Sequence, residues 1–178
     1  MNAQGKVIAT DLDGTLFYPK RRVRMIDTNN KLFLRKFIDN GGRVVLVSGR
    51  NIRYLEKVKR KLKRPVDAIG CNGAFIKVDD KFIKKSPMNN QRLLKVLGEM
   101  NKRYKIAGVF LMCEEYNFVV PKQEFGIKNR IGFLLYQLWQ GIYKEKTVRN
   151  DKVMHDALKH AKIYKIMIFF GPSKKKMI

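Results

Sequence analysis

The stretch Asp11-Leu12-Asp13-Gly14-Thr15-Leu16 decides the fold expected for this chain. It follows the apolar run Val7-Ile8-Ala9, so two carboxylates come where a short buried strand should end. Side chains alternate between the faces of a strand, so Asp11 and Asp13 can point one way while Leu12 packs on the other side. Gly14 permits a sharp turn, and Thr15 adds a hydroxyl and a backbone N–H. Two neighbouring carboxylates repel each other, and a divalent cation such as Mg²⁺ would relieve the repulsion. Taken alone, the two acids are also compatible with a solvated exit from the strand.

Two more apolar runs follow, and each ends near a polar residue. Residues 44–47 run into Ser48, and residues 66–69 precede Asn72. Helical patterns fill the gaps: one begins at the N-cap candidate Thr28 and ends at Gly41-Gly42, and the other runs from residue 52 to Pro65. This β-α-β-α-β order predicts an α/β fold with a Rossmann-like parallel three-layer core. Ligands of such sheets bind beyond the carboxyl ends of the strands, where Asp11, Asp13, Ser48 and Asn72 all fall.

These motifs resemble those of the haloacid dehalogenase-like hydrolases, which are chiefly phosphatases that form an aspartyl-phosphate intermediate. Residues 11–16 resemble the first signature of the family. Residues 43–50, Arg-Val-Val-Leu-Val-Ser-Gly-Arg, resemble the second signature. Residues 68–74, Ala-Ile-Gly-Cys-Asn-Gly-Ala, resemble the next segment of the Cof-type members, which carry a large inserted cap. The resemblance implies an incomplete Rossmann-like core with an incomplete α+β cap domain.

The resemblance also implies roles for particular residues. Asp11 would be the nucleophile, and Asp13 would be the general acid and then the base for the attacking water. Mg²⁺ would be held by the Asp11 carboxylate and the backbone carbonyl of Asp13. Arg50 and Asn72 would lie near the substrate. The phosphate group would be bound by the turn after the first strand and by the end of the second strand, through Leu12, Gly14, Thr15, Ser48 and Gly49.

Three of these residues have structural alternatives that the sequence leaves open. Ser48 can cap the helix that starts near Asn51, and one hydroxyl could serve both purposes. Arg50 is equally compatible with a surface guanidinium. Asn72, followed by Gly73, also fits a plain Asn-Gly turn.

The second half of the chain loses the βαβ order. A hairpin is expected over residues 74–83, a helix over 91–104, strands over 106–112 and 116–120, helices over 128–143 and 150–160, and a strand over 163–170. This mixture predicts two domains, an N-terminal part of the hydrolase core at residues 1–85 and a partial α+β cap at residues 86–178. The aromatic residues of the first late helix are expected to form a core stripe, namely Phe133, Tyr136, Trp139 and Tyr143.

The composition is that of a basic globular protein. The 39 Lys and Arg outnumber the 15 Asp and Glu, which leaves a formal net charge of +24. Such a charge attracts small phosphorylated metabolites as well as polyanions. The basic residues are scattered, however, and no nucleic-acid-binding motif is present, so nucleic-acid binding beyond non-specific electrostatics is not expected. The two cysteines form no metal-ligand pair, and neither a signal peptide nor a membrane span is predicted, which favours the cytoplasm.

Two parts of the family pattern have no counterpart in this sequence. They are a lysine after the cap and a later acidic pair, usually in Gly-Asp-x-x-Asn-Asp. Glu114-Glu115 and Asp151 lack the required context, so the chain is expected to be truncated within its cap and weak or inactive in catalysis. The strand at residues 6–11 would then form an exposed apolar edge and promote self-association. A non-catalytic pseudoenzyme that binds phosphate ligands is the alternative, and a basic nucleic-acid-associated protein is a third interpretation.

Overall fold

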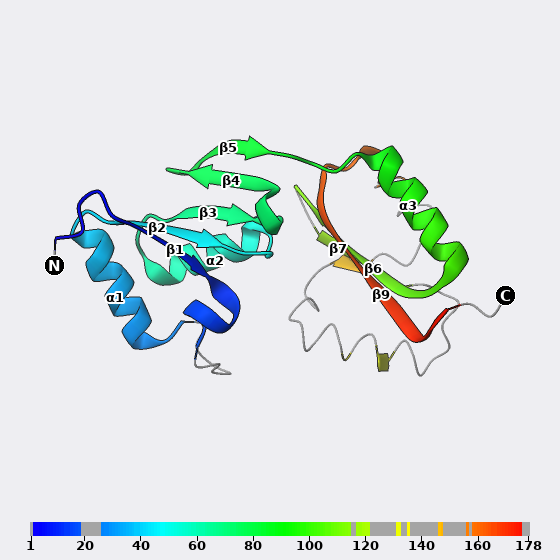
Figure 1. Cartoon of the computed structure of the whole chain (residues 1–178), viewed down its shortest axis with the longest axis horizontal. Coiled ribbons are helices and arrows are strands. Elements are labelled where there is room, and N and C mark those ends of the chain that lie inside the picture. The colour runs from blue at the N-terminus through cyan, green and yellow to red at the C-terminus, as the bar shows by residue number, and fades with distance from the viewer. Residues whose placement is uncertain are drawn as a thin grey trace. The chain divides into compact units, whose positions relative to one another are not determined.

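The computed structural model describes residues 2–18, 26–114, 117–121, 131–132, 135, 146–147, 156 and 158–175. The chain divides into two compact units, Met1–Ser86 and Pro87–Ile178 (Figure 1). Each unit contains a sheet of its own, with five strands in the first and four in the second.

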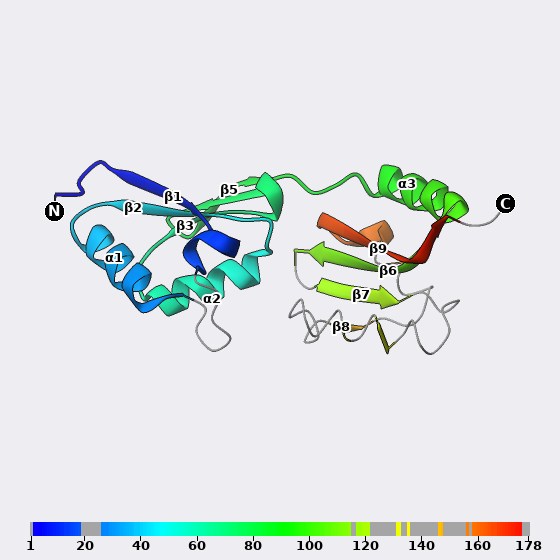
Figure 2. The same ribbon diagram turned by 60° about the horizontal axis from the view of Figure 1, so that its bottom comes forward.

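The first unit is built on three parallel strands, β1 (Val7–Asp11), β2 (Arg43–Val47) and β3 (Asp67–Gly70). Helix α1 (Thr28–Asp39) joins β1 to β2, and helix α2 (Ile52–Leu62) joins β2 to β3. Because the strands lie side by side in chain order, right-handed crossovers place both helices on the same face of the sheet, as Figure 2 shows. The predicted Rossmann-like α/β class is confirmed, with two of its three layers formed by the described part of this unit.

The core of the first unit lies between the sheet and these two helices. Val44 and Leu46 point toward the helices and are 1% and 0% exposed, whereas Val7, on the opposite face of β1, is 60% exposed. The helices contribute apolar residues at helical spacing, so one stripe of each helix is buried. These residues are Leu34 and Phe37 of α1 and Leu55, Val58 and Leu62 of α2.

A polar side chain sets the point where helix α1 begins. The Asp27 carboxylate accepts a hydrogen bond from the backbone N–H of Asn29 at 2.9 Å, so Asp27 is the N-cap of α1 and the prediction of Thr28 was wrong by one residue. Both residue types are good caps, and only the backbone conformation distinguishes them. Helix α1 ends before Gly41, which adopts φ +85°, in agreement with the predicted C-terminal signal.

An antiparallel hairpin extends the sheet beyond β3. Its strands are β4 (Phe75–Val78) and β5 (Lys81–Lys85), close to the expected 74–83. The turn residues Asp79 and Asp80 have φ of 45° and 64°, the left-handed conformation that two-residue hairpin turns require. The strand order β1-β2-β3-β4-β5 makes β1 one edge of the sheet and β5 the other.

The second unit combines helix α3 (Asn90–Arg103) with the strands β6 (Tyr104–Cys113), β7 (Asn117–Pro121), β8 (Lys146–Thr147) and β9 (Ile163–Lys175). The sheet order is β8-β7-β6-β9, and β6 is antiparallel to both neighbours. This unit is therefore α+β, as expected from its sequence, although β9 extends five residues past the expected end at residue 170.

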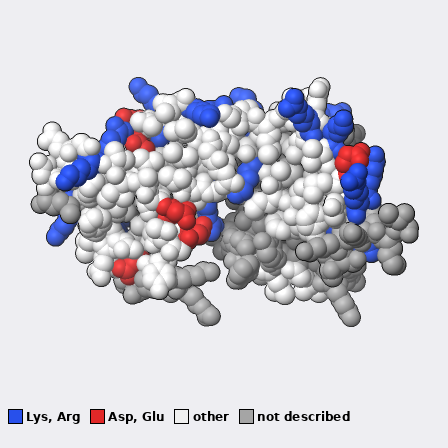
Figure 3. Space-filling view, viewed as in Figure 1, with Lys and Arg blue, Asp and Glu red and all other residues white. Residues whose placement is uncertain are grey.

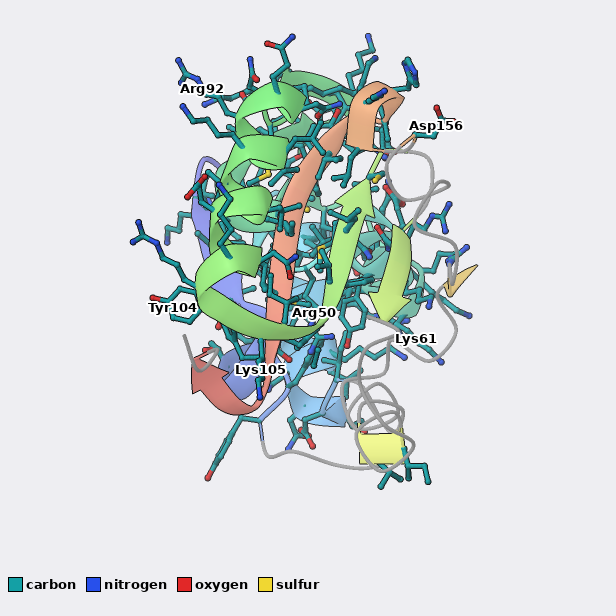
Figure 4. All side chains as sticks on the ribbon, turned by 90° about the vertical axis from the view of Figure 1, so that its right-hand side faces the viewer. Arg50, Lys61, Arg92, Tyr104, Lys105 and Asp156 are labelled. Atoms are coloured by element: carbon teal, nitrogen blue, oxygen red, sulfur yellow. The ribbon has the colours of Figure 1, made fainter. Side chains whose placement is uncertain are left out.

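The core of the second unit forms where α3 packs on β6 and β9. Its buried residues are Leu93, Ile106, Val109, Leu111, Cys113, Leu158 and Ile163. Arg92 projects from the outer side of α3, away from these strands (Figure 4). The expected helices over 128–143 and 150–160, and the aromatic stripe of the first of them, lie largely outside the described residues.

Basic side chains are spread over both units on the face drawn in Figure 3. They do not gather into one continuous patch on that face, which agrees with the scatter seen in the sequence. Within the described residues, the structure contains no helix of the length and hydrophobicity needed to span a membrane.

Candidate active site

The turn after β1 presents the first group of predicted site residues. Strand β1 ends at Asp11, and residues 12–16 curl so that the N–H of Phe17 donates to the carbonyl of Leu12 at 2.9 Å. Leu12 and Leu16 are buried, which anchors the turn to the core. Gly14 adopts φ +87°, a conformation that strains any residue with a Cβ. Asp13 thus lies on a turn rather than on the strand, so strand alternation does not set the direction of its side chain.

The end of β2 contributes Ser48, which is 7% exposed. Its N–H donates to the carbonyl of Ile69 at 2.9 Å, and its Oγ accepts from the N–H of Arg50 at 3.2 Å. The N-cap of α2 is Asn51, whose Oδ1 accepts from the N–H of Tyr54 at 2.9 Å. Ser48 therefore does not cap the helix, and its hydroxyl instead organises the loop that holds Gly49 and Arg50.

The end of β3 turns through Cys71, Asn72 and Gly73, all with positive φ. The N–H of Cys71 donates to the carbonyl of Arg50 at 3.0 Å, and the N–H of Asn72 donates to the carbonyl of Ser48 at 3.4 Å. Asn72 is exposed and takes φ +59°, which fits the Asn-Gly turn that the sequence left open. The β2 and β3 loops are thus joined by backbone hydrogen bonds.

Arg50 connects these loops to the β1 turn. Its Nε lies 2.9 Å from Oδ2 of Asp13, and its Nη2 lies 2.8 Å from Oδ1, which makes a two-pronged ion pair. The guanidinium carbon lies 4.4 Å from the centre of the Tyr54 ring. The hydrogen bond to Asp13 raises the pKa of Arg50, which keeps the guanidinium charged. The structure thus brings Asp13, Ser48 and Arg50 together at the carboxyl end of the sheet.

The carboxylate of Asp11 has different surroundings from that of Asp13. Asp11 is exposed at the end of β1, and none of the described residues forms an ion pair with it. Its side chain is therefore available to a substrate or a cation, whereas the Asp13 carboxylate is already held by an arginine.

The oxygen donors of this turn form only a partial metal site. The described residues contain no group of three or more His, Cys, Asp or Glu side chains placed to hold a metal ion. The Asp11 carboxylate and the Asp13 carbonyl are hard oxygen donors, and Mg²⁺ commonly binds to one or two carboxylates while it keeps several waters. The residues present thus fit Mg²⁺ in donor chemistry.

Tyr54 is the site residue that the sequence did not reveal. It lies four residues after Arg50, half-buried, and its ring also meets that of Phe17 edge-on at 6.2 Å. Because Arg50 precedes Asn51, the N-cap of α2, helical spacing does not predict its contact with Tyr54, and the sequence held no local signal for it.

A family model and several solved structures match this chain. A family model described as haloacid dehalogenase-like hydrolase matches residues 8–178. A comparison with curated proteins finds no match. Among solved structures, a haloacid dehalogenase-like hydrolase from B. subtilis has a TM-score of 0.65 and 20% identity, with 92% of this chain and 61% of that chain covered.

Two further solved structures resemble the chain. One, from a study of phosphatases of the haloalkanoate enzyme superfamily in Bacteroides thetaiotaomicron, has a TM-score of 0.58 and 21% identity, with 86% of this chain and 53% of that chain covered. Another, from a phosphoryl-transfer superfamily, has a TM-score of 0.62 and 17% identity over 93% of this chain and 58% of that chain. The chain thus spans little more than half the length of these structures. Since the family model covers nearly the whole sequence, the chain belongs to the haloacid dehalogenase-like hydrolase family.

Proposed function

We propose that the chain is a Mg²⁺-dependent phosphatase that acts on small phosphate monoesters through an aspartyl-phosphate intermediate. The observation that supports this most directly is the contrast between its two carboxylates. Asp11 forms no ion pair with a described residue, whereas Asp13, two residues later, is bound by Arg50. Carboxylates in different environments are suited to different roles in one reaction.

In the proposed reaction, Asp11 acts as the nucleophile and Asp13 moves protons. An Asp11 oxygen attacks phosphorus, the bond to the leaving oxygen breaks, and Asp13, which must carry a proton at this step, gives that proton to the leaving oxygen. A water oxygen then attacks phosphorus and loses a proton to Asp13. The bond between phosphorus and Asp11 breaks, which releases phosphate and restores both aspartates.

Backbone and hydroxyl groups would hold the phosphate group during both steps. Turn N–H groups of Leu12 to Thr15 and the Ser48 hydroxyl are polar groups at the carboxyl ends of β1 and β2, and Gly49 continues the second of these loops. Preorganised donors of this kind stabilise the charge that develops on the oxygens. Arg50 and Asn72 would border the leaving group.

The Asp11 carboxylate and the Asp13 carbonyl would hold Mg²⁺. When bound, the ion would offset the repulsion between phosphate and carboxylate and orient the phosphate group. Because this set has only two protein donors among the described residues, we expect weak affinity and weak catalysis.

The two units would have separate tasks. The first would be the N-terminal part of the hydrolase core and would act on a small phosphorylated metabolite, and the second would be a partial α+β cap. Cys71 and Cys113 are buried and form no disulfide, which supports a cytoplasmic location, where thiols stay reduced. Burial raises the pKa of the Cys113 thiol to about 12, so that thiol stays protonated at neutral pH.

The direct test is hydrolysis of an aryl phosphate by the chain with Mg²⁺ and with EDTA. Asp11→Asn should reduce turnover by about 1,000-fold or more, because the nucleophile is lost. Asp39→Asn, which alters an exposed aspartate bound to Arg64, is the matched control and should leave turnover unchanged. Turnover that persists in Asp11→Asn would contradict the proposal. A folded chain that binds phosphate or vanadate without turnover would instead be a pseudoenzyme.

We also propose that the chain self-associates through β1. This strand is an edge of its sheet, and the apolar side chain of Val7 on it is 60% exposed. Val7→Lys should shift the sedimentation coefficient toward that of a monomer, because a charge on an edge opposes strand pairing. Ile83→Lys on β5, the other edge, is the control and should have no effect, since that strand already contains Lys81, Lys84 and Lys85. A wild-type chain that sediments as a monomer would contradict this proposal.

A further inference from the structure

Arg50 contacts all three loops at the carboxyl end of the parallel sheet. Its side chain binds Asp13 in the β1 turn, its N–H donates to Oγ of Ser48 at 3.2 Å, and its carbonyl accepts from the N–H of Cys71 at 3.0 Å. Each contact uses a different group of the same residue. Arg50 therefore couples the position of Asp13 to the ends of β2 and β3.

The contact between Arg50 and Asp13 has the geometry of a strong ion pair. Two N–H groups meet the two oxygens of one carboxylate at 2.9 and 2.8 Å, an arrangement that fixes orientation as well as distance. The Tyr54 ring lies against the guanidinium at 4.4 Å and restricts its motion. Lysine could supply the charge but not the planar fork.

Asp13 needs such a contact because its backbone does not define where its carboxylate points. It lies in a turn beside Gly14, and its side chain is 55% exposed. An exposed side chain on a loop would otherwise sample several rotamers. Proton transfer, by contrast, requires the carboxylate within hydrogen-bond reach of the leaving oxygen.

We propose that Arg50, backed by Tyr54, is the positioning residue that fixes the Asp13 carboxylate for proton transfer. The role in proton transfer rests on the proposed function, whereas the ion pair between Arg50 and Asp13 is present in the structure whatever the chain does. This role predicts that loss of Arg50 affects the proton-transfer role of Asp13 more than phosphate binding.

The catalytic test compares leaving groups in Arg50→Gln, Arg50→Lys and Tyr54→Leu. With an alkyl phosphate, whose leaving oxygen needs a proton, kcat should fall about 100-fold in Arg50→Gln and by less in Arg50→Lys and Tyr54→Leu. With dinitrophenyl phosphate, whose leaving group departs without a proton, phosphorylation of Asp11 should slow by less than about 3-fold, while the phosphoenzyme accumulates. Lys57→Gln, an exposed change on α2, the helix that carries Tyr54, is the control for both substrates.

A second measurement tests the ion pair between Arg50 and Asp13 directly and does not require the chain to be active. The Arg50 Nε–H signal in a ¹H–¹⁵N spectrum should be protected from exchange in the wild-type chain and lose that protection in Asp13→Asn, but not in Asp39→Asn. An unprotected wild-type signal would overturn the inference whether or not the chain is active. If the chain is active and Arg50→Gln slows the phosphorylation of Asp11 equally with alkyl and dinitrophenyl phosphate, the positioning role is overturned while the phosphatase proposal stands. If Asp11→Asn has no effect, the phosphatase proposal fails, and the exchange measurement alone decides whether Arg50 positions Asp13.

Discussion

The two ends of the same parallel sheet each hold an arginine bound to an aspartate, but the two pairs differ in their surroundings. At the carboxyl end, Arg50 grips Asp13, whose side chain is 55% exposed. At the amino end, Arg43 at the start of β2 binds Asp67 at the start of β3, whose side chain is 11% exposed. Asp67 also accepts the N–H of Asp79 at 3.0 Å.

The same type of ion pair thus has two different consequences, for stability at one end of the sheet and for activity at the other. The oxygens of Asp67 are occupied by Arg43 and by the hairpin turn, so that carboxylate joins β2, β3 and β4 and is shielded from solvent. The carboxylate of Asp13 is fixed from one side and open on another. We therefore expect the amino-end pair to matter for stability and the carboxyl-end pair for activity.

The largest expected effect is on activity and separates the two ends. Asp13→Ala should reduce Mg²⁺-dependent hydrolysis of an alkyl phosphate by about 100- to 1,000-fold, because it removes the proton donor. Its free energy of unfolding should change by less than about 1 kcal/mol, since exposed ion pairs contribute little. Steady-state kinetics and urea titration of the same sample measure both. A large loss of stability in Asp13→Ala would show that the ion pair at the carboxyl end supports the fold as much as the pair at the amino end does.

The next largest effect is a loss of stability without a loss of activity, the reverse of that expected for Asp13→Ala. Asp67→Ala should lower the free energy of unfolding by about 2 kcal/mol, because a buried charged acceptor is lost and the N–H of Asp79 loses its partner. Turnover by the folded fraction should stay near that of the wild type. Urea unfolding followed by circular dichroism makes the comparison, and a stability equal to that of wild type would refute a structural role for the amino-end pair.

The smallest effect sharpens the amino-end description through its pH dependence. The pKa of Asp80, in the hairpin turn, is lowered from 3.8 by its hydrogen bonds to Lys59 and Lys77. A carboxyl whose folded-state pKa is lowered stabilises the fold above its unfolded pKa, and this contribution is lost as the pH falls through the folded value. Between pH 7 and pH 3, wild type should therefore lose slightly more stability than Asp80→Asn. Parallel slopes for the two proteins would count against the ion pairs.

Much of the first unit was predictable because its patterns are local. The apolar run before Asp11, the Gly41-Gly42 stop and the continuous run 44–47 each depend on neighbouring residues, and the structure confirms the α/β class they predicted. The N-cap of α1 was misplaced by one residue because Asp27 and Thr28 are both suitable caps.

Sequence alone determined which strand ends lie at one edge of the sheet, since parallel strands bring their carboxyl ends together and the motifs mark those ends. Which side chains at this edge contact each other could be seen only in the three-dimensional structure. Arg50 finds Asp13 across 37 positions of sequence and is backed by Tyr54, while Asn51 rather than Ser48 caps α2. A local pattern cannot encode such contacts, because they depend on how separate loops lie in space after the strands have paired.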